Sequence, residues 1–391
     1  MEPRTVLPGA WLGLLGGGQL GRMFCMAAQS LGYKVAVLDP ADDSPAGSVA
    51  DRHLRADYLD GRALAELAAL CRAATTEFEN VPAAALDFLA RSARVTPLAA
   101  SVAIAQDRIS EKTFLAGHGF AVAPFAVLRS AEDARSVDAA LVPGIVKSAR
   151  FGYDGKGQVR VATPSDVMAA FSAMRGQPCV LERFVTLACE VSVIVARNER
   201  SETATWPVAE NRHRDGILDV SIVPARVDAG VAARARDIAC AVAEALDYRG
   251  VLCVEMFVAA DGALLVNEIA PRPHNSGHYT IDACVTSQFE QQARVLADLP
   301  LGDPSQHTPA VMVNLLGDAW FDADGAASAP REPDWRAVLA HPRAKLHLYG
   351  KAEPRRARKM GHVTCLGERL DDALATARAV KAALRIPDDL A

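Results

Sequence analysis

Residues 11–40 have the sequence WLGLLGGGQLGRMFCMAAQSLGYKVAVLDP, and this stretch decides the fold of the first third of the chain. The apolar run at residues 11–16 predicts a strand, residues 21–32 predict a helix, and residues 34–40 predict a second strand. The glycine-rich turn between them fits G-x-G-x-x-G, and Asp39 closes the second strand. This pattern is close to the fingerprint of a nicotinamide or flavin dinucleotide site, so it raises the question of an oxidoreductase.

Strand-like and helix-like segments continue to alternate beyond this stretch. Residues 61–72 predict a helix, residues 73–78 a strand, and residues 81–91 a helix that begins at Pro82, a residue suited to a first helical turn. Alternation of this kind implies a parallel sheet that is covered on both faces.

From Gln106 onward the pattern changes to runs of strands with separate helices, which is typical of an α+β fold. The expected helices are residues 107–120, 231–246 and 370–384. The expected strands are residues 144–149, 158–162, 179–185, 190–197, 203–210, 251–258, 263–270, 310–317 and 344–350.

Composition narrows the function classes. The 391 residues carry a formal net charge of -5, which argues against nucleic-acid binding through a globally basic surface. No uncharged apolar run reaches the roughly 18 residues of a membrane span, and we recognise no signal peptide around Arg4. The eight cysteines lie in apolar surroundings without a C-x-x-C pair. We therefore expect buried, reduced thiols, no zinc site and a cytoplasmic location.

A hairpin is predicted around Asp261-Gly262, a strong signal for a two-residue turn. That turn places Glu255 directly opposite Glu268, and two carboxylates on one face of a ladder repel each other unless a cation or a shared proton lies between them. Because the surrounding strands are apolar, we interpret the pair as Mg²⁺ ligands rather than as a solvated acidic edge. Asn267 is a further polar contact only if a bulge turns its side chain to the same face.

A second motif, VKSARFGYDGKGQVRVA, spans residues 146–162. Its three glycines separate two strands, Lys147 precedes them and Lys156 lies among them. Glycines let backbone N–H groups approach phosphate oxygens, and lysines add positive charge. The motif is not a P-loop, because no G-K-[ST] opens a helix. We expect a hairpin that closes over phosphates, with a mobile surface hairpin as the alternative.

Two polar segments adjoin these motifs. Residues 182–185 end a strand, where backbone groups can pair with a purine edge, and Glu190 can accept both ribose hydroxyls. The loop over residues 267–280 follows the carboxylate strand and is a natural acceptor-substrate site. Zinc at His274 and His278 is disfavoured, because no thiol or carboxylate completes the site.

The segment YGKAEPRRARKMGH, residues 349–362, concentrates basic side chains in an otherwise acidic protein. It either clamps a phosphate monoester or forms a solvated charged face.

Together these residues resemble the ATP-grasp superfamily and, within it, the family of 5-(carboxyamino)imidazole ribonucleotide synthases of purine biosynthesis. The resemblance rests on GGGQLGRM, QDRISEKTFL, GYDGKGQ, NEIAPRPHNSGHYT and LHLYGKAEPRRARKMGH, which occur in the family's order along nearly the whole chain. It implies a mixed α/β and α+β protein in three parts. These are a Rossmann-like domain at residues 1–105, an ATP-grasp domain at residues 106–302 with a lid at about 120–186, and a small, mostly β domain at residues 303–391.

The resemblance also implies the chemistry. Bicarbonate attacks the γ-phosphate of ATP to give carboxyphosphate, and the amine of 5-aminoimidazole ribonucleotide then takes the carboxyl group, directly or through CO₂. ATP and Mg²⁺ are the implied cofactors, and positioning and electrostatics supply most of the catalysis. The lid should exclude water, because carboxyphosphate is labile. A homodimer and a downstream mutase are the implied protein partners, with no nucleic acid and no membrane.

Roles follow for individual positions of this sequence. The implied ATP contacts are Arg108, Lys147, Tyr153, Asp154, Gly155, Lys156, Gly157, Gln158, Glu182, Arg183, Phe184, Val185, Glu190, His213, Asn267 and Glu268. The implied Mg²⁺ ligands are Glu255 and Glu268. The implied substrate-binding residues are Gln19, Tyr153, Asp154, Arg272, His274, Asn275, Lys351 and Arg358. The implied catalytic residues are Tyr153, Asp154, Lys156, Arg272, His274 and Asn275.

Three positions depart from the family's pattern. Ala270 stands where many ATP-grasp enzymes have the Asn of Glu-x-Asn-x-Arg, so a third metal ligand is absent there. Phe151 replaces a glycine of the lid, and Tyr279 replaces a tryptophan; neither change removes a reacting group.

Three alternatives each explain part of the pattern. A biotin carboxylase-like enzyme shares the fold and the carboxyphosphate chemistry but leaves residues 349–362 unexplained. A dinucleotide-dependent oxidoreductase accounts for the opening motif alone. A non-catalytic nucleotide sensor would be expected to have lost a lid lysine or a metal carboxylate, and both are retained. We therefore expect ATP at the lid and the carboxylate hairpin, and the opening glycine loop with Gln19 beside the ribonucleotide substrate.

Overall fold

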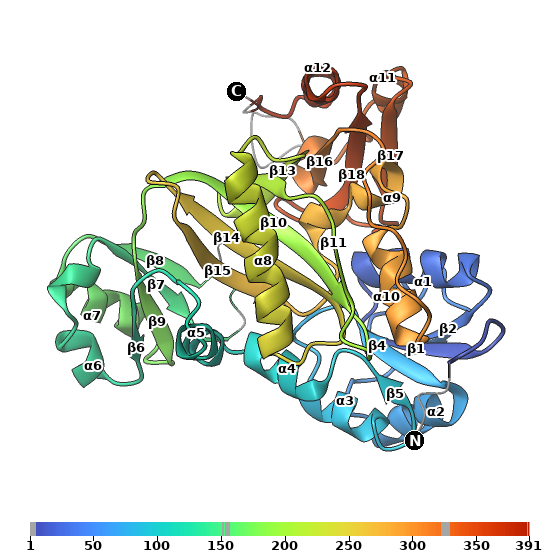
Figure 1. The fold of residues 1–391 in the computed structure, drawn as a ribbon, viewed down its shortest axis with the longest axis horizontal. Coiled ribbons are helices and arrows are strands. Elements are labelled where there is room, and N and C mark those ends of the chain that lie inside the picture. The colour runs from blue at the N-terminus through green and yellow to red at the C-terminus, as the bar shows by residue number, and fades with distance from the viewer. Residues whose placement is uncertain (1–4, 151, 153–156, 322–328, 389, 391) are drawn as a thin grey trace.

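The computed structural model describes residues 5–150, 152, 157–321, 329–388 and 390. In this part of the chain the strands form three sheets (Figure 1). No helix among the described residues is both long enough and apolar enough to cross a membrane.

The first sheet is parallel, with the strand order β3-β2-β1-β4-β5. Its strands are β1 (Trp11–Leu15), β2 (Lys34–Leu38), β3 (Arg52–Leu54), β4 (Ala73–Thr76) and β5 (Arg94–Val95). Its helices are α1 (Gln19–Ser30), α2 (Gly61–Leu70), α3 (Ala83–Leu89) and α4 (Ala99–Ala105). Two apolar cores, one on each face, confirm the predicted covered sheet. The short strands β3 and β5 were not predicted, because neither contains an apolar run.

A small antiparallel sheet, β6-β9-β7-β8, forms a separate lobe with its own apolar core (Figure 1, green). Its strands are β6 (Phe125–Leu128), β7 (Gly144–Ser148), β8 (Gln158–Val161) and β9 (Cys179–Arg183). It carries α6 (Ala131–Arg135), the 3-10 helix η1 (Ala139–Leu141) and α7 (Pro164–Ala173). Helix α5 (Arg108–Gly117), which contacts both β9 and β15, connects this lobe to the centre.

The largest sheet has nine strands, ordered β15-β14-β10-β12-β13-β16-β18-β17, with β11 on β10. The strands are β10 (Leu187–Arg197), β11 (Thr203–Thr205), β12 (Ala209–Arg214), β13 (Ile217–Val223), β14 (Gly250–Ala259), β15 (Leu264–Ala270), β16 (Ala310–Leu316), β17 (Ala344–Leu348) and β18 (Lys359–Leu366). The C-terminal strands thus extend the central sheet. Strands β12, β13 and β18 were not predicted, because each contains polar residues that interrupt the apolar pattern.

Helices cover this central sheet in two places. Helix α8 (Ala229–Ala245) packs on β10 and β14, and α12 (Leu370–Ala383) packs on β16 and β18. The remaining elements are η2 (Asn275–Gly277), α9 (Thr280–Ala283), α10 (Gln288–Leu296), η3 (Gly317–Trp320) and α11 (Trp335–Leu339). Helix α10 lies against α1 and so ties the central sheet to the first sheet.

The hairpin that carries the two glutamates differs from the prediction in its turn. The Ala259 N–H donates to the Ala263 carbonyl, so the loop has three residues instead of two, with Gly262 in the left-handed region at φ 81°. A three-residue loop that ends in a left-handed glycine is a common hairpin connection. A bulge at Asn267 then shifts the register by one residue, so that Glu255 lies opposite Glu268 as predicted.

A buried ion pair fastens the last helix to the sheet. The Nζ of Lys381 on α12 lies 2.7 Å from Oδ2 of Asp219 on β13, and Arg214 contacts the other oxygen of that carboxylate at 2.7 Å. Both side chains of the Lys381–Asp219 pair are almost completely buried. Removing one partner of such a pair leaves a buried charge without full compensation.

We therefore predict that Lys381→Met lowers the free energy of unfolding by about 3 kcal/mol, measured by urea denaturation. Arg343→Met, which breaks an exposed pair with Glu368, is the matched control and should change it by less than about 1 kcal/mol. Equal effects of the two substitutions would contradict the assignment.

Candidate active site

One cavity of about 300 Å³ collects residues from the small sheet, from the central sheet and from the loop that follows β4 of the first sheet. Its walls include residues after β4, the first turn of α5, strand β7, and strands β10, β12, β14 and β15. Eleven of the predicted site residues line it, namely Arg108, Lys147, Gln158, Glu190, His213, Glu255, Asn267, Glu268, Arg272, His274 and Asn275. The tertiary structure therefore brings together residues that lie up to 167 positions apart in the chain, from Arg108 to Asn275.

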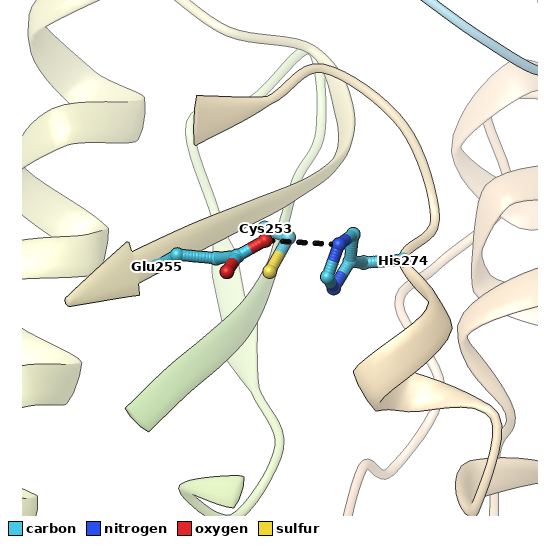
Figure 2. A group of neighbouring side chains, drawn as sticks. All are labelled: Cys253, Glu255 and His274. Carbon is cyan, nitrogen blue, oxygen red and sulfur yellow. Dashed lines mark ion pairs between the residues drawn. The ribbon is translucent and has the colours of Figure 1, made fainter. Parts of the chain in front are cut away.

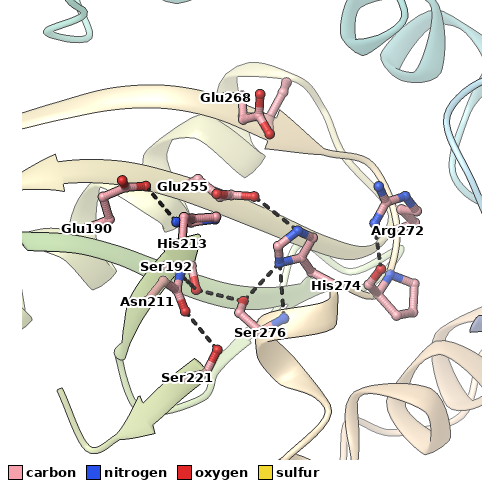
Figure 3. Close-up of polar contacts among 12 residues, drawn as sticks. Glu190, Ser192, Asn211, His213, Ser221, Glu255, Glu268, Arg272, His274 and Ser276 are labelled. Atoms are coloured by element: carbon pink, nitrogen blue, oxygen red, sulfur yellow. Dashed lines mark hydrogen bonds and ion pairs between the residues drawn. The ribbon is translucent and has the colours of Figure 1, made fainter. Parts of the chain in front are cut away.

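The carboxylate pair lies on neighbouring strands at one wall of this cavity (Figure 3). Oε2 of Glu268 lies 3.3 Å from Nη1 of Arg108, and Oε1 of Glu255 lies 3.0 Å from Nε2 of His274. Burial alone would raise the pKa of Glu255, but His274, His213 and Arg272 lower the pKa to about 2. Glu255 is therefore ionised at neutral pH.

The oxygen atoms of Glu255, Glu268 and the neighbouring Asn267 suit a hard divalent cation. The bulge in β15 places Asn267 on the cavity wall, and its Oδ1 is buried with no hydrogen-bond partner among the described residues. Two carboxylates and an amide oxygen are the kinds of ligand that Mg²⁺ prefers. Glu255, Asn267 and Glu268 thus fit the predicted metal.

A thiol also lies near this wall. The ligand atoms of Cys253, Glu255 and His274 all lie within 4.8 Å of one another (Figure 2). The reason given for disfavouring zinc, that no thiol or carboxylate completes a site at His274, is therefore wrong. Burial raises the pKa of Cys253 well above its ordinary value, so the thiol is protonated. His278 is not part of this group, because its ring packs 4.7 Å from that of His362.

The ATP side of the cavity is built from buried charges. Lys147 lies 3.0 Å from Oε2 of Glu182, and the fully buried Lys112 lies 3.4 Å from the same oxygen. Two lysines thus share one carboxylate, and burial lowers the pKa of Lys112. Burial would raise the pKa of Glu182, but Lys147, Lys112 and Arg108 lower it. Lys147 lines the cavity, where a lysine side chain favours phosphate binding.

Glu190 and His213 form a second pair on this side, with Nδ1 of His213 3.1 Å from Oε2 of Glu190. Burial lowers the pKa of His213, but the contact with Glu190 and the charges of Glu255 and Glu268 together raise the pKa above its ordinary value. Both residues line the cavity, and the role of Glu190 as acceptor of the ribose hydroxyls stays a prediction.

The strand end predicted to pair with a purine uses part of its backbone internally. The N–H of Arg183 donates to the Pro124 carbonyl, and the N–H of Phe184 donates to the Pro143 carbonyl. A purine contact would therefore use the other backbone groups of residues 182–185. The ring of Phe184 is exposed, and the guanidinium of Arg160 lies 6.0 Å from its centre.

The substrate side contains polar groups held ready for a ligand. The Nε of Arg272 donates to Glu79, which fixes its guanidinium at the cavity wall. Asn275 is 6% exposed and lines the cavity, and neither its Nδ2 nor its Oδ1 has a partner among the described residues. A buried amide without partners is costly, so these atoms point to a polar ligand.

The predicted phosphate clamp lies beside the first glycine loop rather than in the cavity wall. Nζ of Lys351 donates to Oε1 of Gln19 at 2.8 Å, so the structure joins two predicted substrate residues that are 332 positions apart. Arg358 donates to the Glu353 carbonyl at 2.8 Å within its own loop, and the neighbouring Lys359 lines the cavity.

A carboxyl group of the chain itself already occupies the first glycine loop. The carboxylate of Glu77 accepts the N–H groups of Gly18 and Gly21 at the start of α1. A dinucleotide phosphate would need these same donors. In addition, Tyr58 O–H donates to Oδ2 of Asp39 at 2.6 Å, which removes the residue that would bind a cofactor ribose. These contacts argue against the oxidoreductase alternative.

The predicted lid residues Tyr153, Asp154, Gly155 and Lys156, together with the departure at Phe151, lie outside the described residues. Gly157 is described, with φ at 70°, and its carbonyl accepts the N–H of Ser148.

Several charged residues around the cavity were not predicted. Glu79 contacts Arg272, and Glu111 accepts the N–H of Ile269 beside the metal strand. Burial and the charge of Glu268 raise the pKa of Glu111 to about 7, although Arg108 and Lys112 lower it. Two signals could have found these residues. The sequence EFEN follows a parallel strand, at the end where ligands bind, and RISEK places charges on one face of a helix.

Family models match three segments of the chain. Residues 10–106 match a ribonucleotide synthetase preATP-grasp domain, residues 113–289 an ATP-grasp domain, and residues 310–376 the phosphoribosylaminoimidazole carboxylase C-terminal domain. The predicted fold class is thereby confirmed: a parallel N-terminal sheet, an ATP-grasp domain and a C-terminal part of antiparallel strands.

Relatives match over almost the full length. N5-carboxyaminoimidazole ribonucleotide synthase of Brucella melitensis is 47% identical over 93% of this chain and 98% of its own. A solved N5-carboxyaminoimidazole ribonucleotide synthetase in complex with ADP is 41% identical and has a TM-score of 0.89, covering 97% of this chain and 98% of its own. An Aspergillus clavatus N5-carboxyaminoimidazole synthase in complex with ADP and 5-aminoimidazole ribonucleotide is 31% identical, with a TM-score of 0.86 over 96% of this chain and 98% of its own. The chain belongs to the family of N5-carboxyaminoimidazole ribonucleotide synthases, which are ATP-grasp ligases.

Proposed function

We propose that this protein carboxylates 5-aminoimidazole ribonucleotide with bicarbonate at the expense of ATP, giving N5-carboxyaminoimidazole ribonucleotide, ADP and phosphate. One observation carries the proposal: a single cavity holds the carboxylate pair and lysine of a nucleotide site next to a buried amide without partners, that of Asn275. The solved relative that holds ADP and 5-aminoimidazole ribonucleotide together supports the same pairing of ligands.

ATP binds on the side of Lys147, Glu190 and Arg108. Lys147 and Arg108 neutralise phosphate charge, and Glu190 accepts the ribose hydroxyls. Glu255, Asn267 and Glu268 would hold Mg²⁺, which when bound neutralises charge on the transferring phosphoryl group. Because Arg108 contacts Glu268, the phosphate site and the metal site share one network of charges.

The carboxyl transfer takes place on the side of Arg272, His274 and Asn275. A bicarbonate oxygen attacks the γ-phosphorus and ADP leaves; the ribonucleotide amine then bonds to the carboxyl carbon and phosphate leaves. Arg272 is held by Glu79 and can bind the carboxylate oxygens of bicarbonate. Asn275 supplies the hydrogen bonds that orient the acceptor. The predicted lid lysine Lys156 and the predicted Tyr153 and Asp154 belong to the same proposal.

We further infer that Lys351, Arg358 and Gln19 bind the phosphate end of the ribonucleotide substrate. We also infer that the protein is a cytoplasmic homodimer and that its product is passed to a mutase. The contact between Lys351 and Gln19 supports the first inference. The resemblance of the sequence to its family supports the others.

A substrate-omission assay tests the function. Phosphate release should require ATP, Mg²⁺, bicarbonate and 5-aminoimidazole ribonucleotide together. Release that is unaffected when 5-aminoimidazole ribonucleotide is omitted would overturn the proposal.

The metal assignment predicts that Glu268→Gln lowers kcat by on the order of 100-fold or more, because it removes one charged oxygen ligand from the phosphoryl-transfer site. The far-ultraviolet circular dichroism spectrum should stay unchanged. Glu368→Gln, at an exposed glutamate, is the control and should keep normal kcat. Activity retained in Glu268→Gln would count against the metal site.

The clamp assignment predicts that Lys351→Met raises the KM for 5-aminoimidazole ribonucleotide about 10- to 100-fold, because one charge-assisted hydrogen bond to phosphate is lost. The KM for ATP should change little. Lys345→Met removes an exposed lysine from β17 and should leave both constants unchanged. A change in the KM for ATP alone would contradict the clamp.

A further inference from the structure

A row of buried polar side chains crosses the apolar central sheet behind His274. Ser192 lies on β10, Asn211 on β12, Ser221 on β13 and Ser276 on η2. Each of these four residues is at most 3% exposed. Polar groups at such positions need hydrogen-bond partners, and here they find them in one another.

The contacts form one continuous chain (Figure 3). Ser221 Oγ lies 2.9 Å from Asn211 Oδ1, and Asn211 Nδ2 lies 2.9 Å from Ser192 Oγ. Ser192 Oγ lies 2.7 Å from Ser276 Oγ, which lies 2.9 Å from Nδ1 of His274. The chain therefore runs from the middle of the sheet to the imidazole at the cavity.

The direction of this chain is set by a backbone group. The N–H of Ser276 points at Nδ1 of His274 at 3.3 Å, and a backbone N–H can only donate. Nδ1 must therefore be an acceptor, and the proton of the neutral ring lies on Nε2. The same direction satisfies every link, because Ser221 donates to Asn211, Asn211 to Ser192, Ser192 to Ser276, and Ser276 to His274.

On the opposite side of the imidazole ring, Nε2 of His274 faces Glu255. Nε2 of His274 lies 3.0 Å from Oε1 of Glu255, so its proton is donated to that carboxylate. Ser192 lies directly opposite Glu255 in the ladder between β10 and β14. The network therefore contacts both partners of the His274–Glu255 hydrogen bond. Ser192 lies opposite Glu255 in the sheet, and Ser276 holds the imidazole ring of His274.

We propose that Ser192, Asn211, Ser221 and Ser276 are positioning residues that hold His274 in the tautomer with its proton on Nε2, where it donates to Glu255. This inference rests on the proposed function, since it assigns His274 to the carboxylation site. In this tautomer Nε2 serves as a hydrogen-bond donor and has no lone pair for a metal or a proton. The lone pair of the ring lies on Nδ1, where it accepts from the N–H and the hydroxyl of Ser276.

Selective ¹⁵N labelling of histidine tests the tautomer directly. In the wild-type protein, the side-chain signals of His274, assigned by comparison with His274→Asn, should show an unprotonated Nδ1 and a protonated Nε2. In Ser276→Ala and Ser192→Ala the chain is interrupted at different links. Both variants should shift His274 toward a mixture of tautomers while the other histidine signals stay in place.

Kinetics supply the second readout. Both variants should lower kcat for the bicarbonate-dependent reaction about 10-fold, as expected for a group that orients a site residue, with the KM for ATP within about twofold. Ser101→Ala is the matched control. Ser101 is 2% exposed and its hydroxyl donates to the Leu246 carbonyl, away from the network. It should leave kcat and the His274 signals unchanged.

Three results would overturn the proposal: a wild-type His274 protonated on Nδ1, unchanged signals and kcat in both variants, or a fall in kcat without any change of tautomer. The last result would indicate a packing role only. Failure of the proposed function is distinguishable, because it would appear as ATP hydrolysis by the wild type without 5-aminoimidazole ribonucleotide, whatever tautomer His274 adopts.

Discussion

The electrostatic constraint on which the site depends is the placement of Glu255 and Glu268 opposite each other in an apolar sheet. Two carboxylates in that position destabilise the fold unless positive or proton-donating groups surround them. Arg108 reaches one from α5 and His274 reaches the other from the loop after β15. The contacts of Arg108 and His274 with the two carboxylates therefore join α5 and the loop after β15 to the central sheet. The same carboxylates are the ones that suit a phosphate-bound metal ion.

The residues around the two carboxylates are themselves held by further polar contacts. Glu79 holds Arg272, Glu111 holds the backbone of β15, and Lys112 shares Glu182 with Lys147. Glu111, Lys112 and Glu182 are buried, and Glu79 and Arg272 are half-buried, so a missing partner is costly. Rigid support of this kind is what a reaction through a labile acyl phosphate requires, because misplaced groups would let water compete.

The sequence predicted the hairpin register correctly although its turn was wrong. The extra loop residue and the bulge at Asn267 shift the register in opposite directions, and the face of Glu255 and Glu268 is restored. A bulge cannot be read from an apolar pattern, because it depends on how neighbouring strands twist and pair. Strands β12 and β13 escaped prediction for a related reason: their buried polar residues are satisfied only across the sheet.

What the sequence determined by itself was the parallel first sheet, the carboxylate pair and the family, because apolar periodicity, turn residues and spaced motifs are local properties of a chain. Only the tertiary structure decided which groups satisfy one another. It placed Glu77 on the glycine loop where a dinucleotide phosphate would otherwise bind, and Lys351 beside Gln19. It also aligned the serines behind His274. These contacts join residues far apart in sequence, and their partners are selected by burial, which no local pattern records.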